Sequence, residues 1–231
     1  MGGNENIIFT IATWLIPLAI AITFHEVAHG WVARANGDQT AARLGRLSLN
    51  PIKHVDPIGT IALPTFLAVI GAPIFGWAKP VPVMQNQLND PRWDMVKVAA
   101  AGPATNIILG IVGAVLLGIA LVIFGSGGDS MAKAFILANL LNFITINIFL
   151  ALFNMIPIPP FDGSKVLGGF LPPSLGIPFQ NLERFGFLFL IILIVVVPRV
   201  TGVNVVAKIV MPPFQWVMER LDSIVTAISG L

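Results

Sequence analysis

The sequence predicts an all-α polytopic membrane protein of about five to six helices, with a re-entrant loop or short β segment near residues 58–83. Of the 231 residues, 56% are hydrophobic and only 10% are charged, whereas a soluble domain has about 25% charged residues. Apolar runs that approach or exceed the roughly 20 residues needed to span a bilayer also recur along the chain. These runs cover residues 7–32, 58–77, 98–124, 134–156 and 185–197.

The first of these runs, residues 7–32, predicts a membrane helix that is retained in the mature protein. It contains His and Glu and has no plausible cleavage site, which argues against a removed signal peptide. A polar stretch follows at 34–56, with turn signals at Asn36-Gly37-Asp38 and Asn50-Pro51.

The second run is irregular in composition. Residues 58–77 are interrupted by Pro64, Gly71, Pro73 and Gly76. The alternating prolines of residues 76–83 then exclude a helix and favour an extended edge strand.

Two long membrane helices are expected next, near 98–124 and 132–155, with a loop at 125–130 between them. A proline-rich segment, a helix near 183–198 and an amphipathic helix near 211–229 complete the chain. With no internal repeat and no separate soluble module, we expect one integral membrane domain over residues 1–231. Its catalytic core would cover about 7–170 and its C-terminal helices about 183–231.

The residue types present limit the chemistry and the partners. There is no cysteine, so disulfides and thiolate ligands are excluded, and a transition-metal site must use His, Asp, Glu or water. The formal net charge is +2. Juxtamembrane Lys and Arg residues that set the membrane topology account for this small excess. The lipid bilayer is thus the expected environment, nothing indicates a nucleic-acid partner, and no oligomeric state is predicted.

Residues 25–29 read His-Glu-Val-Ala-His inside the first apolar run. On a helix, His25 and His29 lie one turn apart on the same face, so both imidazoles can bind one zinc ion while Glu26 holds a water beside it. Ionisable groups at membrane depth are costly and usually functional. The motif therefore predicts His25 and His29 as zinc ligands and Glu26 as the general base or acid.

A catalytic zinc usually has three protein ligands and one position for water. The candidates for the third ligand are His54, Asp56, Asp162 and, less plausibly, Glu183. His54 offers the commoner donor atom but lies in a polar loop. Asp162 is favoured, because neighbouring prolines exclude a helix and Gly163 permits a tight turn that can aim the carboxylate.

The path of residues 58–77 bears on this choice. If the segment crosses the membrane, the basic residues of 34–53 and 79–97 lie on opposite sides, contrary to the usual distribution of Lys and Arg. If it enters and returns, those residues gather on one face and Asp162 comes back to the depth of His25 and His29. We therefore expect a re-entrant segment, which membrane depth tolerates where it lines a wet cleft.

Three segments together resemble the site-2 protease family of intramembrane zinc metalloproteases: residues 25–29, the Ala-Gly-Pro-Ala-Thr-Asn of 101–106, and 154–163. The resemblance covers roughly residues 15–170, and residues 50–51 and 76–83 resemble the compact subgroup without PDZ or CBS modules. Phe161 replaces the usual small apolar residue, which affects only local packing.

The resemblance implies one Zn²⁺ per chain, with the Asp of the Asp-Gly motif, here Asp162, as its third ligand. It also implies a catalytic role for Asn154 near the zinc, where its amide assists the oxyanion while Glu26 accepts a proton from the attacking water. An interhelical hydrogen bond is the alternative role of Asn154. Asn106 is expected to be structural, bracing the bend at Gly102-Pro103.

The substrate implied by the resemblance is a transmembrane protein segment, which must be unwound before its scissile carbonyl can be reached. We predict that the extended segment pairs with the unwound substrate as an added strand. Trp77, Val81 and Val83 are then the substrate-binding residues. An ordinary connecting loop is the alternative.

A metal-ion transporter and a catalytically silent scaffold are the competing functions. Transport favours acidic or His residues spread along crossing helices, but residues 98–124 and 134–156 contain no Asp, Glu or His. A silent scaffold is expected to lose the His-Glu-x-x-His motif, which is intact. The sequence therefore predicts a zinc metalloendopeptidase of a prokaryotic cytoplasmic membrane, with its active site nearer the cytosolic side.

Overall fold

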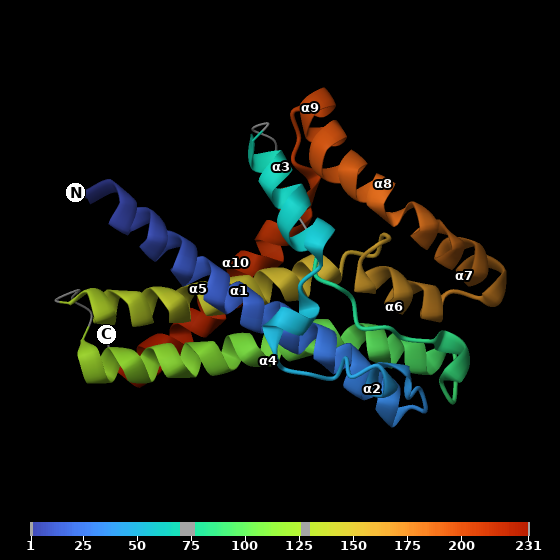
Figure 1. Cartoon of the computed structure of the whole chain (residues 1–231), viewed down its shortest axis with the longest axis horizontal. Coiled ribbons are helices and arrows are strands. Elements are labelled where there is room, and N and C mark those ends of the chain that lie inside the picture. Colours follow the sequence, from blue (N-terminus) through green and yellow to red (C-terminus); the bar gives the residue numbers. More distant parts are fainter. Residues whose placement is uncertain (1, 70–76, 126–129, 231) are drawn as a thin grey trace.

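Helices make up the regular structure of this protein. The structure, a computed structural model, describes residues 2–69, 77–125 and 130–230, and those residues include no β strand. Four helical stretches among them are long and apolar enough to cross a membrane. They are Ile7–Ala35 within α1 (Gly2–Ala35), α4 (Trp93–Phe124), α5 (Met131–Asn154) and Pro173–Thr201. The predicted all-α polytopic fold is confirmed (Figure 1).

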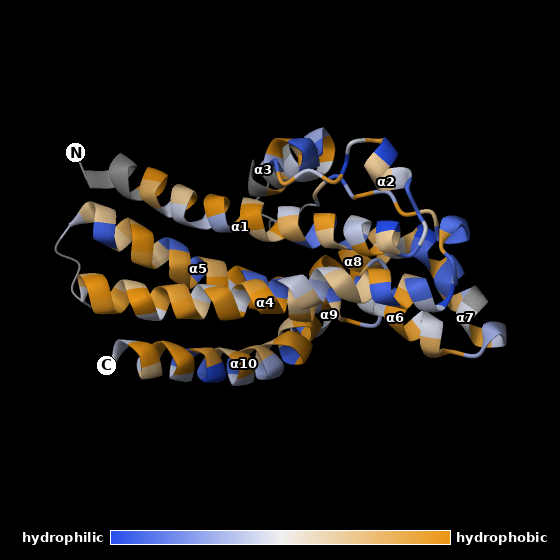
Figure 2. Cartoon of the chain, turned by 90° about the horizontal axis from the view of Figure 1, so that it is seen from below, coloured by the Kyte–Doolittle hydropathy of each residue, from blue (hydrophilic) through white to orange (hydrophobic). Residues whose placement is uncertain are grey.

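The long helices form layers. Figure 2 shows α1 on one side, α4 and α5 in the middle, and α10 (Val205–Ser229) on the other side. Their middle is packed by Ala114 of α4, Ile144 and Ile148 of α5, and Leu221 and Val225 of α10. The expected amphipathic C-terminal helix is thus present and begins earlier, at Val205, with its apolar face on α4 and α5.

Glycines let α4 and α5 approach closely. A Cβ atom built on Gly110 would lie 2.6 Å from Ile148 Cδ1, and one built on Gly113 would lie 2.9 Å from Ile144 Cγ1. Small residues at helix contacts serve this purpose in membranes, where packing drives association. This close contact between α4 and α5 brings Asn106 of α4 next to Asn147 of α5.

Local capping sets the ends of these helices. Gly125 ends α4 with a φ of 71°, a backbone conformation that suits glycine. Ser130 caps α5, because its hydroxyl oxygen accepts a hydrogen bond from Lys133 N at 3.3 Å. Asn204 caps α10 in the same way through Ala207 N.

The fourth spanning stretch is assembled from short pieces. It joins α7 (Pro173–Gln180), the 3₁₀ turn η4 (Asn181–Phe185), α8 (Gly186–Ile191), the π turn η5 (Ile192–Val196) and α9 (Val197–Thr201). The sequence predicts a helix only near 183–198, whereas the observed stretch begins at Pro173. It continues through Pro178, whose missing N–H weakens regular α hydrogen bonding.

The ends of the predicted re-entrant segment meet. The segment begins with the π turn η2 (Pro57–Ala62) and α3 (Leu63–Val69). Residues 70–76, among them the interrupting Gly71, Pro73 and Gly76, lie outside the described part of the chain. Trp77 N donates to Gly59 O at 3.1 Å, and Thr60 Oγ1 donates to Trp77 O at 2.9 Å. The chain therefore returns at residue 77 to the place that it left at residue 59.

Residues 77–84 follow as an extended segment, which we call the strap. The strap has no helix, as predicted, but within the described residues it pairs with no other strand. The remaining short elements are α2 (Thr40–Arg43), η1 (Pro51–His54), η3 (Gln85–Gln87) and α6 (Asp162–Phe170).

Candidate metal centre

Three potential ligands converge from two helices. His25 and His29 lie on one face of α1, and Asp162 is the first residue of α6. The Nε2 atoms of His25 and His29 lie 3.2 and 3.4 Å from Asp162 Oδ2. One ligand atom from each residue falls within 4.8 Å of the others, and both histidines are buried. The expectation that Asp162 returns to the depth of the histidines therefore agrees with this geometry.

The outer nitrogens of both imidazoles are occupied. His25 Nδ1 lies 2.6 Å from Asn106 Oδ1, and His29 Nδ1 lies 2.7 Å from the carbonyl oxygen of Val98. Both partners are oxygen acceptors, so each Nδ1 carries the proton and each Nε2 presents a lone pair. Histidines that bind metals are oriented in this manner in most metal sites.

These residues fit a zinc ion. Asp162 Oδ2 is buried and, among the described residues, accepts no hydrogen bond, although two ring nitrogens lie within 3.4 Å of it. A buried carboxylate oxygen facing two lone pairs is unfavourable unless a cation lies between them. Two neutral imidazoles and one carboxylate make a common ligand set for catalytic zinc.

Glycine leaves room for the two rings. A Cβ atom built on Gly102 would lie 2.5 Å from His25 Cε1 and 2.6 Å from His29 Nε2. On Gly163 a Cβ atom would collide with the backbone carbonyl of Met155. Gly102 of α4 and Gly163 of α6 are therefore required by close approach at the centre.

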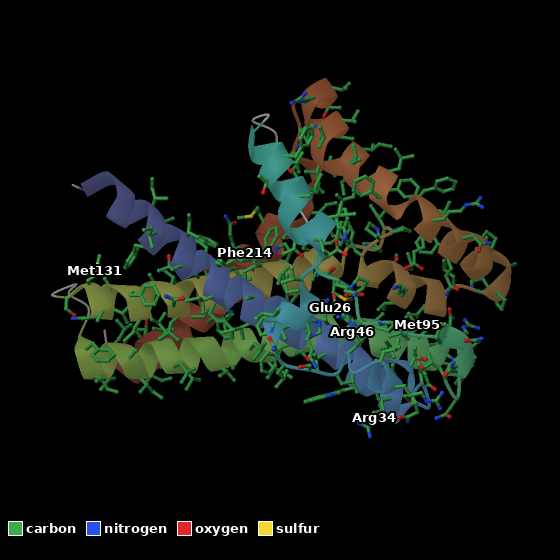
Figure 3. All side chains as sticks on the ribbon, viewed as in Figure 1. Glu26, Arg34, Arg46, Met95, Met131 and Phe214 are labelled. Atoms are coloured by element: carbon green, nitrogen blue, oxygen red, sulfur yellow. The ribbon has the colours of Figure 1, made fainter. Side chains whose placement is uncertain are left out.

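Glu26 lies beside this group and is bonded to the strap. Glu26 Oε2 accepts a hydrogen bond from Val81 N at 2.8 Å. In Figure 3, Glu26 and Arg46 lie near the middle of the molecule, far from Met131 at one end of the bundle. The backbone of Val81 is consequently the nearest part of the strap to the predicted base.

Arg46 holds the strap in place. Its guanidinium donates to the carbonyl oxygens of Lys53 and Lys79, the latter at 2.7 Å, and to that of Pro80 at 3.3 Å. Lys79 N in turn donates to His54 O at 2.8 Å. The strap is thus fixed to the preceding loop by main-chain groups on both sides of Pro80.

Asp38 fixes the far end of the strap. Its buried carboxylate accepts hydrogen bonds from Met84 N at 2.7 Å and from Thr40 N at 2.8 Å. Burial raises the pKa of the Asp38 carboxyl, but the hydrogen bonds from Thr40 and Met84 outweigh burial and hold that pKa below its ordinary value. Asp38 is therefore ionised where it receives these donors.

The other candidates for the third ligand have different partners. His54 is buried and its Nε2 lies 2.7 Å from Ser48 O. Asp56 caps η2 by accepting from Ile58 N and Gly59 N, and Glu183 forms an ion pair with Lys165 at 3.1 Å. The metal-binding group found among the described residues includes none of these three.

Asn154, predicted to assist the oxyanion, is the last residue of α5. Its Nδ2 donates to Leu150 O at 3.0 Å, one turn back in the same helix. An amide NH₂ carries two hydrogens, so the second N–H of Asn154 stays available to a substrate. Among the other predicted residues, Val81 is buried while Trp77 is partly exposed and stacks edge-on with Phe187, with ring centroids 5.6 Å apart.

Sequence reasoning missed two contacts at the centre. The prediction that Asn106 braces a bend overlooks its bond to His25, and no role was foreseen for Arg46. Both contacts join segments far apart in the sequence. The Ala-Gly-Pro-Ala-Thr-Asn motif is the one signal that points to Asn106, and it predicts a structural role without naming His25 as the partner.

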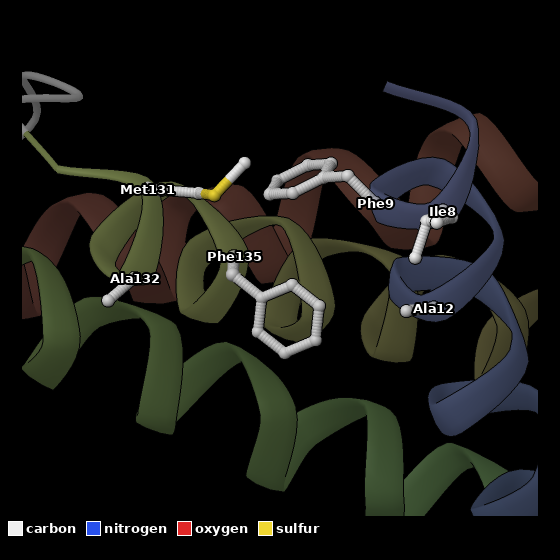
Figure 4. A pocket seen from close by; sticks show the side chains of 6 residues that line it. All are labelled: Ile8, Phe9, Ala12, Met131, Ala132 and Phe135. Atoms are coloured by element: carbon white, nitrogen blue, oxygen red, sulfur yellow. The ribbon is translucent and has the colours of Figure 1, made fainter. Parts of the chain in front are cut away.

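Two hollows lie elsewhere in the described structure. One, of about 680 Å³, lies between the starts of α1 and α5 (Figure 4). It is lined by Ile8, Phe9, Ala12, Met131, Ala132 and Phe135. At a rise of about 1.5 Å per residue, Ala12 is roughly 20 Å along α1 from His25. The other is lined by Trp31, Arg34, Ala35 and Gln39, so neither includes a residue of the metal-binding group.

Comparison with known proteins identifies the family. Residues 13–197 match the model of Peptidase family M50. The Bacillus subtilis protein named "Putative zinc metalloprotease YwhC" is 40% identical over 185 residues, which cover 78% of this chain and 79% of that protein. "Putative zinc metalloprotease MJ0611" of Methanocaldococcus jannaschii is 34% identical over 158 residues, covering 66% of this chain and 68% of that protein.

A more distant relative, "Putative zinc metalloprotease Rip2" of Mycolicibacterium smegmatis, is 28% identical over 195 residues, which cover 81% of this chain and 67% of that protein. No solved structure matches the chain. The family match covers α1, α4, α5 and α6, the helices that carry the candidate metal centre and its supporting residues. The chain belongs to peptidase family M50, the site-2 protease family, and is a zinc metalloprotease of the membrane.

Proposed function

We propose that this metalloprotease is an intramembrane endopeptidase, which hydrolyses peptide bonds within or near transmembrane segments of membrane protein substrates. One observation carries the proposal. His25, Glu26 and His29 lie on a helix that is apolar enough to span a bilayer, and Asp162 approaches them there. A metal transporter is expected to carry acidic or His residues along its crossing helices. Here α4 has only Asp94 and α5 has none.

The charge distribution supports a site near the cytosolic face of a prokaryotic cytoplasmic membrane. Figure 2 shows hydrophilic residues concentrated at the end of the bundle that holds α2, α6 and the start of α4. Arg34, Arg43, Arg46 and Lys53 belong to this end. Lys and Arg are enriched in cytoplasmic loops of membrane proteins.

His25, His29 and Asp162 would hold the zinc ion. When bound, zinc supplies Lewis-acid polarisation of a carbonyl and makes a neighbouring water more acidic. Glu26 accepts the proton of the attacking water and passes it to the leaving amide nitrogen. The hydrogen bond from Val81 N orients the Glu26 carboxylate in the resting structure.

Asn154 would stabilise the developing oxyanion by donating from its side-chain amide. One N–H of Nδ2 donates to Leu150 O, and the second N–H would donate to the substrate. The bond to Leu150 O thus holds the Asn154 amide in place and leaves one N–H for the oxyanion.

The strap would bind the substrate, with Trp77, Val81 and Val83 as its contacts. Most of its amides are already used, because Trp77, Lys79 and Val81 donate to Gly59, His54 and Glu26. Pro80 and Pro82 have no N–H. Within the described structure Ala78 N and Val83 N have no hydrogen bond, so strand addition would rest on these two amides, of which Val83 belongs to the predicted substrate contacts.

The proposed roles are tested with a reporter that carries one transmembrane segment. We expect Glu26→Gln to keep its zinc and to lose cleavage, since the amide cannot accept the proton. Glu219→Gln on α10 is the matched control and should cleave as the natural protein does. Cleavage by Glu26→Gln at the natural rate would refute the role of Glu26, and cleavage only outside the membrane segment would refute the intramembrane assignment.

The role of the strap is tested at residue 83. Val83→Pro removes the free N–H, and Val83→Ala keeps it while shortening the side chain. We expect cleavage to fall in the proline variant and to persist in the alanine variant, with zinc content unchanged in both. Equal cleavage by the two variants would leave the strap as a connecting loop.

A further inference from the structure

A chain of hydrogen bonds runs from α5 through α4 to His25. Asn147 of α5 and Asn106 of α4 are both fully buried, and Asn106 Nδ2 donates to Asn147 Oδ1 at 2.7 Å. Asn106 Nδ2 also donates to Ala21 O at 3.2 Å. On its other side, Asn106 Oδ1 lies 2.6 Å from His25 Nδ1. A buried amide is thus bonded on both sides, at membrane depth.

Backbone carbonyls fix the direction of every bond in this chain. Asn147 Nδ2 donates to Phe143 O at 2.8 Å, so Asn147 turns its oxygen toward Asn106. Asn106 must then turn its NH₂ toward Asn147 Oδ1 and Ala21 O, since both can only accept. This leaves Asn106 Oδ1 facing His25, and an oxygen acceptor requires the proton to be on His25 Nδ1.

We infer that Asn106, oriented by Asn147, is a positioning residue that sets the tautomer of His25. With the proton held on Nδ1, His25 Nε2 presents its lone pair toward Asp162, where zinc would bind. The inference rests on the proposed role of His25 as a ligand, and it assigns Asn106 and Asn147 a function that acts through His25. Both side chains are fully buried, so neither is placed to contact a substrate.

Different groups hold the proton on Nδ1 in the two histidines. His29 Nδ1 donates to the backbone oxygen of Val98, which no side-chain substitution removes. His25 depends on a side chain, and therefore on the packing of α4 against α5. His29 consequently serves as an internal control in any experiment that alters Asn106.

Zinc affinity of the purified protein, measured by competition with a chelator, tests the inference. We expect Asn106→Leu to bind zinc about 10- to 100-fold more weakly, the range for lost partners of metal-binding histidines. Asn147→Leu should weaken binding less, since Ala21 O still orients Asn106. Asn139→Leu, two turns away on α5, should bind zinc as the natural protein does.

Rescue by a conservative variant separates positioning from packing. Asn106→Asp keeps an oxygen for His25 Nδ1, although its second oxygen replaces the donor that faced Asn147 and Ala21, so it should bind zinc more tightly than Asn106→Leu. If Asn106→Asp binds zinc no more tightly than Asn106→Leu does, the inference is overturned. A zinc affinity of Asn106→Leu equal to that of the natural protein would also overturn it.

Nitrogen-15 spectra of the histidine side chains in metal-free protein give a second readout. The natural protein should show His25 and His29 both protonated on Nδ1. In Asn106→Leu the His25 signals should shift toward a mixture of tautomers while the His29 signals stay in place. A general distortion of α4 would displace Val98 as well and alter both histidines alike, which would contradict a specific role of Asn106.

Failure of the site itself is distinguishable from failure of this inference. His25→Ala and His29→Ala should each abolish tight zinc binding. If either retains it, the proposed ligand set is wrong. If both lose it while Asn106→Leu binds normally, the ligands stand and the positioning role of Asn106 is refuted.

Discussion

At the scale of single residues, the centre depends on the absence of side chains as much as on their presence. Gly102 lies where a Cβ atom would come within 2.6 Å of both imidazoles. Alanine is favoured over glycine in a helix interior by about 1 kcal/mol, so the glycine is retained there against helix propensity. The space that it leaves is occupied by His25 and His29.

Gly102→Ala should therefore lose zinc without unfolding. The methyl group displaces the rings that would share one ion, and the better helix propensity of alanine offsets part of the strain. Zinc content and melting temperature of the purified variant measure the two effects. Gly110→Ala is the control, since its methyl group meets Ile148; it should lower the melting temperature and keep its zinc. Natural zinc content in Gly102→Ala would show that the rings can move aside.

The sequence predicted some of these residues better than others, for physical reasons. His25, Glu26 and His29 follow from helix periodicity alone, since residues one turn apart share a face. Asp162 was favoured among four candidates by its neighbouring prolines and glycine and by the expected topology, and the family resemblance implies the same residue. Its distances to the histidines could not be predicted, because they depend on how α5 and the following turn pack. The contact of Asn106 with His25 could not be predicted, because it requires the register between α1 and α4.

At the scale of elements, the strap is held by polar contacts rather than by strand pairing. Arg46 donates to carbonyls on both sides of Pro80. Hydrogen bonds that involve a charged group contribute about 1.5–3 kcal/mol each when buried, and less at a half-exposed residue such as Arg46. The sequence predicted the extended form from its prolines, but not the guanidinium that fixes it.

Arg46→Leu should release the strap and leave the zinc content of the metal centre unchanged. The carbonyls of Lys79 and Pro80 lose their donor, so the strap should be cut faster by a protease under native conditions, while zinc content stays at the natural level. Arg46→Lys should be intermediate, because an ammonium group lacks the planar fork that reaches several carbonyls. Proteolysis rates equal to the natural rate in both variants would show that Arg46 does not hold the strap.

Asp38 gives the strap a dependence on pH. Folding lowers the pKa of Asp38, so its contribution to stability is present above its unfolded pKa of about 3.9 and is lost as pH falls through the lower folded-state value. In Asp38→Asn one donor from the pair Thr40 N and Met84 N loses its acceptor at every pH.

We therefore expect the melting temperature of Asp38→Asn to lie below that of the natural protein at pH 7, and the difference to shrink below about pH 4. Thermal unfolding followed from pH 7 to pH 3 measures this. Asp222→Asn on α10 controls for the general loss of one carboxylate. A difference that stays constant to pH 3 would mean that ionisation of Asp38 does not hold the strap.

At the scale of the whole molecule, topology brings the ligands to one depth. The long apolar runs predicted α1, α4 and α5 closely, because length and composition determine a membrane helix. The stretch Pro173–Thr201 was predicted too short, since Pro173 and Pro178 lie within it and prolines usually mark a helix boundary. The return of the chain after α3 rested on the distribution of Lys and Arg, and the bonds between Trp77 and residues 59–60 support it.

This topology can be tested with single cysteines, because the chain has none of its own. Ile52, Met131 and Phe170 are well exposed in the structure, so each can be replaced without disturbing the core. If the segment after α3 returns to its own side, and α4 and α5 cross out and back, cysteines at residues 52 and 170 share one face. A cysteine at 131 lies on the opposite face.

A membrane-impermeant maleimide applied to intact cells should therefore label Met131→Cys, and should label Ile52→Cys and Phe170→Cys only after the membrane is opened. Glu26→Gln carrying the same cysteines controls for changes caused by self-cleavage. Labelling of residues 52 and 170 from opposite sides would mean that residues 58–77 cross the bilayer. Asp162 would then emerge a full membrane thickness from His25 and His29, and the metal centre could not form.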